Sequence, residues 1–192
     1  MPPSTPAQPD PPIVADSAAL RAILRHQAST VTVVTAPGAP PVGFTATSFT
    51  SVSLEPPIVS FCLNLASSSW PTVSRSRHVA VHLLAHDQRE LARRFATSGV
   101  DRFAGPTRWR PGPQGVPILD GVLAWLLCRV VDRVTVGDHA IVLAEPELLH
   151  ADVGTPLLYH RGGYAGLDPV TGPEPPHGPG AAVVTAPARP AG

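Results

Sequence analysis

The sequence predicts a mainly β protein, a small antiparallel barrel with a few short helices beside it. Most apolar segments are β-branched and are separated by turn residues, as in TVTVVTA at 30–36 followed by PGAPP at 37–41. Only two segments carry a clear helical period. Because strands do not alternate with helices along the chain, a doubly wound parallel sheet is excluded.

A single folded domain is expected at residues 16–167. The chain has 192 residues, of which 43% are apolar, which is enough for a hydrophobic core once flexible ends are set aside. Proline is crowded into residues 1–12 and 168–192, where the apolar periodicity also ends. We therefore expect disordered tails at 1–15 and 168–192 that are dispensable for stability and activity.

The charged residues exclude several classes of function. The 14 basic and 14 acidic residues balance, so the electrostatic attraction that drives binding to nucleic acids or anionic membranes is missing. All basic residues are arginine. Without lysine there can be no internal Schiff base with pyridoxal phosphate and no Walker-type phosphate loop. Small neutral or zwitterionic molecules are the expected partners.

The cysteines and the N-terminal sequence indicate a cytoplasmic protein. Cys62 and Cys128 lie in apolar segments, and we expect both to be inert core thiols. The first 25 residues do not resemble a signal peptide. No apolar segment reaches the roughly 18 residues that a membrane-spanning helix needs.

The first half of the domain is expected to open with a helix and continue as strands. DSAALRAILRHQA at 16–28 forms an amphipathic helix behind an Asp16 or Ser17 cap. The segments 30–36 and 42–49 form a hairpin, and PPIVSFCLNL at 56–65 forms another strand that starts after proline.

The middle of the domain alternates briefly between helix and strand. SSSWPTV at 67–73 has the form of a helix start, with Ser69 as the cap and Pro71 just inside. HVAVHLLA at 78–85 predicts a strand, and DQRELARRFA at 87–96 predicts a helix capped by Asp87.

The last third predicts a long hairpin and a closing strand. Residues 121–149 are too β-branched for one helix, and Gly137-Asp138 divides them at a turn. PLLYHRGGYAGL at 156–167 is expected to be a final strand.

Two hydroxyl-rich segments are candidates for ligand contacts. A polar loop within 43–61 offers donors to a planar heteroaromatic ring or a phosphate, although an ordinary polar loop has the same composition. Its hydroxyl residues are Thr45, Thr47, Ser48, Thr50, Ser51 and Ser53. SSSW at 67–70 could seat a phosphate at a helix start, whereas a plain N-cap would also explain Ser69.

The histidines divide into two cases. His78, His82 and His86 recur every fourth residue, but the segment alternates like a strand and no further ligand cluster completes a metal site. Asp138 and His139 lie at the expected tip of the long hairpin, where a titratable pair can orient or polarise a ligand. A surface turn histidine is the alternative interpretation.

Taken in order, these segments resemble the flavin reductase family of the FMN-binding split barrel. The resemblance covers roughly residues 16–167. It rests on TVTVVTA, GFTATSFTSVSLEPPIVSFCLN, SSSW, HVAVHLLAHDQRELARRFA, DRFAG, GVPILDGVLAWLLCRV, GDHAIVLAE and PLLYHRGGY. Members of this family are the reductase components of two-component flavin-dependent monooxygenases, and the resemblance implies a homodimer of split barrels.

The resemblance also implies a set of site residues. Those along the isoalloxazine ring are Thr45, Ala46, Thr47, Ser48, Phe49, Ser51 and Val52. Those along the ribityl chain and the phosphate are Cys62, Leu63, Asn64, Ser67, Ser68 and Ser69. Asp87, Gln88 and Phe95 belong to a flanking helix, His160, Arg161 and Tyr164 to the closing strand, and Asp138 and His139 to the nicotinamide side, where they are the implied catalytic pair.

The implied reaction is the reduction of FMN or FAD by NADH or NADPH, after which the reduced flavin diffuses to a monooxygenase. The chain departs from its relatives in two places. It has His82 where they often carry asparagine, and no basic residue lies between Gly38 and Trp70. Phosphate would then be neutralised by hydroxyls, backbone amides and Arg75, Arg93 or Arg94.

Two other functions are compatible with the same barrel. One is an oxidase that holds FMN tightly and acts on a small organic substrate, in which case the yellow colour would survive dialysis. The other is a module that binds flavin or haem without catalysis, in which case added flavin would not support NADH oxidation.

Overall fold

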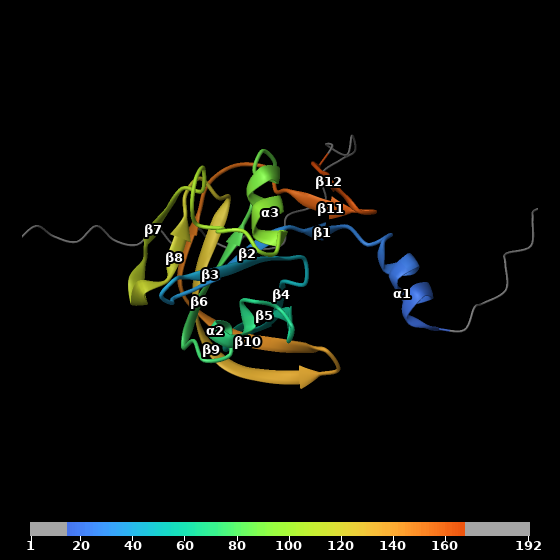
Figure 1. Cartoon of the computed structure of the whole chain (residues 1–192), viewed down its shortest axis with the longest axis horizontal. Helices are drawn as coiled ribbons and strands as arrows, with labels where there is room; N and C mark the ends of the chain where they lie inside the picture. Colours follow the sequence, from blue (N-terminus) through green and yellow to red (C-terminus); the bar gives the residue numbers. More distant parts are fainter. Residues whose placement is uncertain (1–14, 168–192) are drawn as a thin grey trace, which may run out of the picture.

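A computed structural model describes residues 15–167, and its centre is a seven-stranded antiparallel sheet (Figure 1). The strands are ordered β3-β2-β6-β9-β10-β5-β4. Their bounds are β2 Thr32–Ala36, β3 Val42–Ala46, β4 Thr50–Leu54, β5 Pro57–Asn64, β6 His78–Leu83, β9 Ala124–Val136 and β10 His139–Ala151. The predicted hairpins at 30–49 and 121–149 and the strands at 56–65 and 78–85 are confirmed.

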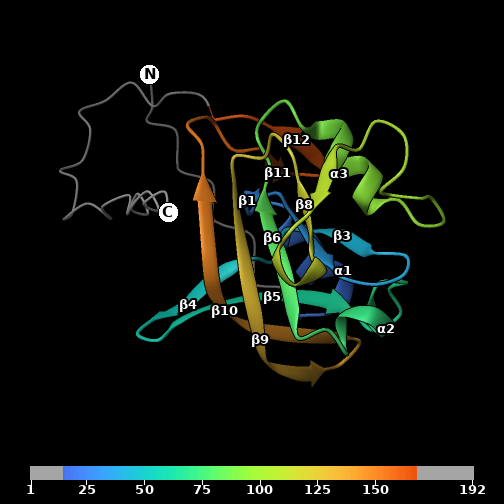
Figure 2. The ribbon, with the colours of Figure 1, turned by 90° about the vertical axis from the view of Figure 1, so that its left-hand side faces the viewer.

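The sheet curls into a barrel that does not close. Strands β9 and β10 bend along their length (Figure 2), where their register shifts at Leu143/Ala144 and again at Pro146/Leu148. Strands β3 and β4 are the two edges of the sheet and do not pair with each other. The opening between the edges is the split of the barrel, and the mainly β, split-barrel prediction is therefore confirmed.

Several smaller elements differ from the sequence prediction. Thr50–Leu54 is strand β4 and not part of a loop. The expected single strand at 156–167 is a hairpin of β11 Leu158–His160 and β12 Gly163–Ala165, which pairs with β1 Ser29–Thr30. The proline-rich segment between the third helix and β9 also contains β7 Trp109–Pro111, the 3-10 turn η1 Pro113–Gly115 and β8 Pro117–Leu119. These strands are too short for an alternating pattern to identify.

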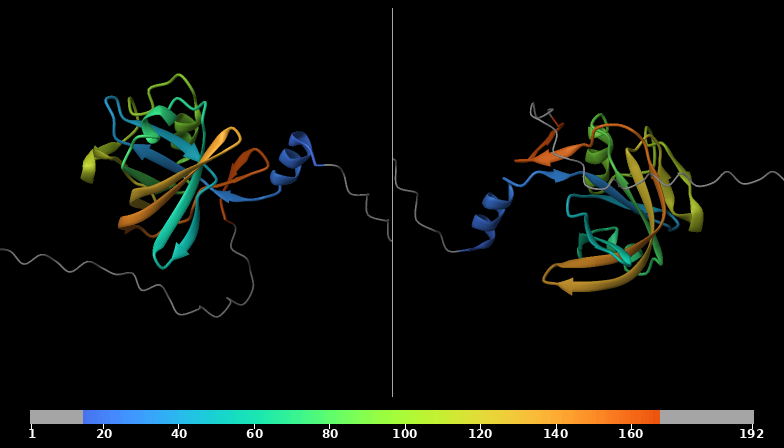
Figure 3. Two further views of the ribbon diagram at one scale, coloured as in Figure 1. Left: turned by 90° about the horizontal axis from the view of Figure 1, so that it is seen from below. Right: turned by 180° about the vertical axis from the view of Figure 1, so that it is seen from behind.

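The first helix, α1 Ser17–Leu24, is shorter than the predicted 16–28 and stands away from the barrel (Figures 1 and 3). Asp16 caps it as expected, because its Oδ1 accepts hydrogen bonds from the amides of Ala18 at 2.9 Å and Ala19 at 2.8 Å. Its apolar side chains are largely exposed within residues 15–167: Leu20, Ile23 and Leu24 are 54%, 61% and 53% exposed.

The other two helices begin differently from the prediction. In α2, Trp70–Val73, the Ser69 side chain makes no capping bond. In α3, Arg89–Ala96, the N-cap is Gln88 and not Asp87. Helix α3 packs against the barrel at Gly43, where an added Cβ would lie 2.6 Å from the Phe95 ring, so only glycine allows this approach.

The hydrophobic core has two main parts. One fills the barrel and includes Phe44, Phe61 and Val142. The other lies beneath α3 and includes Val33, Leu84 and Phe95. Within the described chain, no helix is long and apolar enough to cross a membrane.

Buried His82 joins the barrel to the β7–β8 hairpin. Its Nδ1 lies 3.0 Å from the Val33 carbonyl oxygen, and its Nε2 accepts a hydrogen bond from the Leu119 amide at 3.1 Å. The ring is therefore neutral, with its proton on Nδ1. Burial, the largest cause, lowers the pKa of His82 from 6.5 to about 4. Residues 15–167 contain no group of histidines, cysteines or carboxylates suited to a metal.

Candidate functional site

The main candidate site is a cavity of about 750 Å³ at the split of the barrel. Its walls come from β3 on one side and from β5 and the segment after it on the other, with α3 and the following loop across the top. The expected site residues that line it are Thr45, Ala46, Thr47, Ser48, Cys62, Leu63, Asn64, Ser67, Ser68, Phe95 and His139. Its size is typical of a cofactor site.

The hydroxyls on the β3 side are already engaged in the fold. Thr45 Oγ1 donates to the Ala92 carbonyl of α3 at 2.6 Å. Ser48 Oγ accepts from the Cys62 amide at 2.9 Å, which links the segment after β3 to β5. Both hydroxyls therefore hold the cavity walls in place. Of the hydroxyl side chains between Thr45 and Ser48, that of Thr47 makes no hydrogen bond within the described residues.

The β5 side ends at a hydrogen-bonded corner. Asn64 accepts a bond from the Ala66 amide at 2.8 Å through Oδ1, and its Nδ2 lies 3.4 Å from Asp138 Oδ2.

Cys62 lines the cavity and is only half-buried, so the prediction of two core thiols holds for Cys128 alone. Burial raises the pKa of the Cys128 thiol to about 12.

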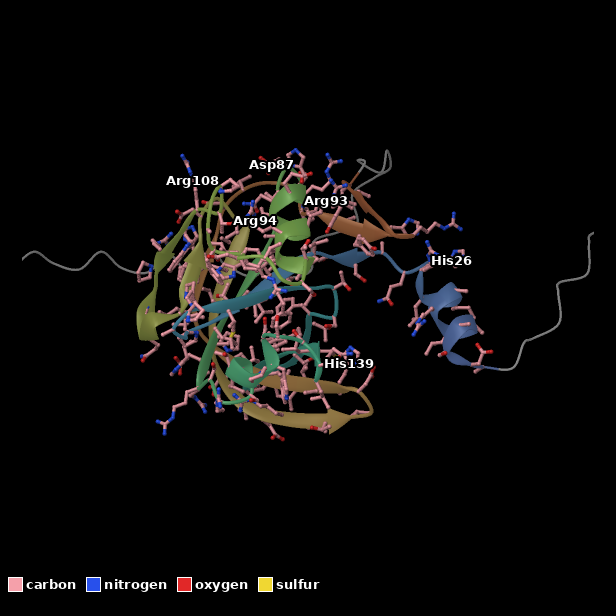
Figure 4. All side chains as sticks on the ribbon, in the orientation of Figure 1. His26, Asp87, Arg93, Arg94, Arg108 and His139 are labelled. Carbon is pink, nitrogen blue, oxygen red and sulfur yellow. The ribbon has the colours of Figure 1, made fainter. Side chains whose placement is uncertain are left out.

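Asp138 and His139 form the expected pair at the turn between β9 and β10. Gly137 has a φ of 59°, as this two-residue hairpin loop requires. Asp138 Oδ1 lies 2.7 Å from His139 Nδ1, and the His139 bond is the largest cause that lowers the pKa of Asp138. The His139 side chain lines the cavity, and His139 is labelled in Figure 4 beside the hairpin.

The three serines of SSSW do not share one role. Ser67 and Ser68 line the cavity. Ser69 is fully buried, and its hydroxyl donates to the Gly43 carbonyl at 3.2 Å. The expectation that Ser69 holds phosphate is therefore wrong, because its hydroxyl faces the protein interior.

Arg102 is the cavity residue that sequence reasoning missed. Its Nη1 donates to the Gly43 carbonyl at 2.8 Å and to Ser69 Oγ at 3.2 Å, while Nε and Nη2 donate to the Thr97 carbonyl. Arg102 makes no ion pair with a carboxylate within residues 15–167. Burial lowers the pKa of its guanidinium. The cavity thus has one partly buried positive charge that lacks a counterion.

The arginines first considered for phosphate lie elsewhere. Arg93 and Arg94 line a separate cavity on the outer side of α3, and Arg75 lines one near the β2–β3 turn. Arg93 and Arg94 are labelled in Figure 4. DRFAG at 101–105 belongs to the family pattern, but nothing in that segment indicates that Arg102 reaches the cavity.

The remaining expected residues do not line the main cavity. Ser51 and Val52 are on exposed β4, and Phe49 packs against the barrel core. Asp87, Tyr164 and β12 line a smaller cavity. The side-chain oxygen of Gln88 accepts a hydrogen bond from the Ala85 amide. His160 is exposed, and Arg161 lies in a cavity that adjoins the main one at Thr47 and Ser48.

Comparison with known proteins agrees with this geometry. A family model described as a flavin reductase like domain matches residues 24–168. An NADH:FMN oxidoreductase from Rhodococcus qingshengii is 44% identical over 150 residues, covering 75% of this chain and 78% of the relative.

Two further similarities involve a monooxygenase subunit and a solved complex. The reductase subunit of a flavin-dependent monooxygenase from Mycobacterium tuberculosis is 37% identical, with 80% of this chain and 84% of the relative covered. An NADH:FAD oxidoreductase from Streptomyces globisporus, solved with NAD and FAD fragments, has a TM-score of 0.77 and 33% identity, with 82% and 96% covered.

Proposed function

Because the chain belongs to the flavin reductase family, we propose that it oxidises NADH or NADPH, reduces FMN or FAD, and releases the reduced flavin to a separate monooxygenase. The observation that carries this proposal is the cavity at the split of the barrel, with the Asp138–His139 pair and the uncompensated Arg102 on its walls. The similarity to a monooxygenase reductase subunit supports the release of the product to a partner.

The residues of the cavity fit a flavin phosphate at one end. Ser67, Ser68 and Arg102 all line the cavity, and Arg102 Nη1 lies 3.2 Å from the Oγ of the adjacent Ser69. Four of the five Arg102 donors are used by protein oxygens, so one donor and the full positive charge are available to an anion. A bound phosphate would offset the cost of burying this charge.

The rest of the cavity fits the ring and the hydride donor. When bound, the flavin and the nicotinamide supply the hydride chemistry themselves. The protein contributes alignment, with Thr45 to Ser48 and Cys62 to Asn64 forming the walls along the ring. Asp138 fixes the tautomer of His139 by accepting its Nδ1 proton, which leaves Nε2 to contact the nicotinamide amide.

We further propose that the flavin is a transient substrate. Only one arginine faces the phosphate end, so moderate affinity is expected. A dissociation constant near 1 μM with association near 10⁶–10⁷ M⁻¹s⁻¹ gives release at roughly 1–10 s⁻¹. This is about the turnover of a typical enzyme. Both cysteines are free thiols, which supports a reducing, cytoplasmic setting.

Replacement of His139 by alanine is expected to impair use of the nucleotide and to spare flavin binding. Loss of one hydrogen bond to a ligand costs about 0.5–3 kcal/mol, depending on charge, so kcat/KM for NADH should fall roughly 2- to 150-fold. The flavin dissociation constant should change little. Steady-state kinetics and fluorescence titration measure the two quantities, with His86→Ala as the control because His86 is exposed and outside the cavity. Loss of flavin binding in His139→Ala would contradict the assignment.

We also propose that the protein is a homodimer and that α1 takes part in the interface. Leu20, Ile23 and Leu24 form an exposed apolar face that no other described segment covers. Light scattering should give twice the chain mass of 20.0 kDa. Ile23→Glu should shift the mass toward that of the monomer. A fully active monomer of the unmodified chain would refute this proposal.

A further inference from the structure

A second cavity, of about 550 Å³, lies between the end of α1 and the β11–β12 hairpin. Three arginines line it, Arg21 and Arg25 from α1 and its C-terminal end and Arg161 from the hairpin turn. Tyr159 adds an aromatic ring. Thr47 and Ser48 line both this cavity and the main one, so the two adjoin.

The arginines are held in place by a short network. The Arg161 amide donates to the Arg25 carbonyl at 3.1 Å, and Arg25 Nη2 donates to the Arg161 carbonyl at 3.4 Å. Arg161 Nη2 lies 3.1 Å from His26 Nδ1. His26, labelled in Figure 4, marks the place where α1 meets the hairpin. The guanidinium groups are therefore positioned by contacts between segments far apart in the sequence.

The backbone at Arg161 is unfavourable for an arginine. Its φ is 53° and that of Gly162 is 87°, so the two residues form a tight turn that asparagine followed by glycine would suit better. A non-glycine residue in this conformation is uncommon and costs free energy.

Within residues 15–167 the arginines of this cavity have no carboxylate at ion-pair distance. Arg21 nevertheless lies near enough to Asp138 to add to the lowering of the pKa of that carboxyl, of which the bond to His139 is the largest cause. Three guanidinium groups around one cavity repel each other, and a ligand with two negative charges would relieve that repulsion. Guanidinium groups are also well suited to phosphate oxygens.

We propose that this second cavity binds the diphosphate of the nicotinamide nucleotide, with the adenine against Tyr159. This inference rests on the proposed function, because it places the nucleotide so that its nicotinamide reaches the main cavity past Thr47 and Ser48 toward His139. The adenylate half of FAD is a less suitable occupant. It would extend from the phosphate end of the flavin at Ser67, Ser68 and Arg102, none of which lines the second cavity.

Direct binding of ADP tests the cavity without catalysis. Titration calorimetry on the full chain compares the wild type with Arg161→Asn, Arg25→Gln and a control, Arg108→Gln, whose side chain is exposed and lines neither cavity (Figure 4). Arg161→Asn removes the guanidinium and suits the turn, so its melting temperature should be unchanged or higher. Each cavity variant should weaken ADP binding about 10-fold or more, and the control should not.

Kinetics with two hydride donors complete the test, with FMN as the acceptor because it has no adenylate. Arg161→Asn should raise the KM for NADH about 10-fold or more relative to its effect on the KM for 1-benzyl-1,4-dihydronicotinamide, which has no phosphate. Equal ADP binding by the wild type and both variants, or no ADP binding by the wild type at millimolar concentration, would overturn the inference. ADP binding that depends on the arginines, in a wild type that oxidises no NADH with any flavin, would instead contradict the proposed function.

Discussion

Acidification from pH 7 to pH 4 is expected to destabilise the protein by about 3 kcal/mol through His82 alone. The pKa of this histidine is lowered from 6.5 to about 4 in the folded state, chiefly by burial. Below pH 6.5 the unfolded chain gains a proton at this position and the folded chain does not. The contribution of His82 to the free energy of unfolding is therefore fully present above pH 6.5 and is lost progressively as the pH falls toward 4.

The effect is measured as a difference between two proteins. Urea unfolding of the wild type and of His82→Asn at several pH values removes the contributions of all other titrating groups from the comparison. The wild type should lose about 3 kcal/mol relative to the variant between pH 7 and pH 4. His86→Asn provides the baseline for removal of an exposed histidine. Parallel stability curves for the wild type and His82→Asn would show that His82 is not held neutral by the fold.

At pH 7, substitutions of His82 test the hydrogen bond that its ring accepts from the Leu119 amide. His82→Leu should be less stable than His82→Gln, because leucine leaves the buried Leu119 amide without its acceptor. An unpaired buried donor costs about 1–3 kcal/mol. The Oε1 atom of glutamine has about the same reach as the histidine Nε2, so it can still accept this hydrogen bond.

Replacement of Arg102 by alanine is expected to reduce FMN affinity about 10- to 150-fold, the effect of losing a charged hydrogen bond worth roughly 1.5–3 kcal/mol. Ser68→Ala should reduce it about 2- to 12-fold, for a neutral bond worth roughly 0.5–1.5 kcal/mol. Riboflavin has no phosphate, so its affinity should be much less affected by either change. Fluorescence titration with FMN, FAD and riboflavin measures all three affinities.

The control for Arg102 is its neighbour Arg94. Arg94 also ties down the loop after α3, through the carbonyls of Asp101 and Ala104, but it lines a different cavity. Arg94→Ala should therefore disturb the loop without selective loss of FMN over riboflavin. If Arg94→Ala and Arg102→Ala weakened FMN and riboflavin alike, Arg102 would act through loop structure and not through its charge on the phosphate.

The barrel was predictable because its strands are long and carry local signals. The hairpin of β9 and β10 combines β-branched residues with Gly137 at the turn, and β6 alternates clearly enough to exclude a helical histidine face. The proline-containing strands β7 and β8 have only three residues each, too few for any period to appear. They form because tertiary contacts such as the Leu119–His82 bond hold them.

Site residues could be predicted where they belong to a local sequence motif. They could not be predicted where their position depends on tertiary contacts. Thr47, Ser68 and His139 could be placed by their motifs, and they do line one cavity. Ser69 could not, because its partner Gly43 lies 26 residues away in sequence. Arg102 reaches the cavity from a loop whose path is set by the same kind of long-range bonds, so no local pattern identifies it.

The most direct test of the account is a steady-state matrix of NADH and NADPH against FMN, FAD and riboflavin, followed at the nucleotide absorbance with dialysed protein. The account predicts that nucleotide oxidation requires added flavin and saturates with it. FMN and FAD should saturate at lower concentration than riboflavin, because Ser67, Ser68 and Arg102 line the proposed phosphate end. Nucleotide oxidation that is absent for every pair, or that proceeds in colourless protein without added flavin, would contradict the claim that this cavity is where a diffusible flavin is reduced.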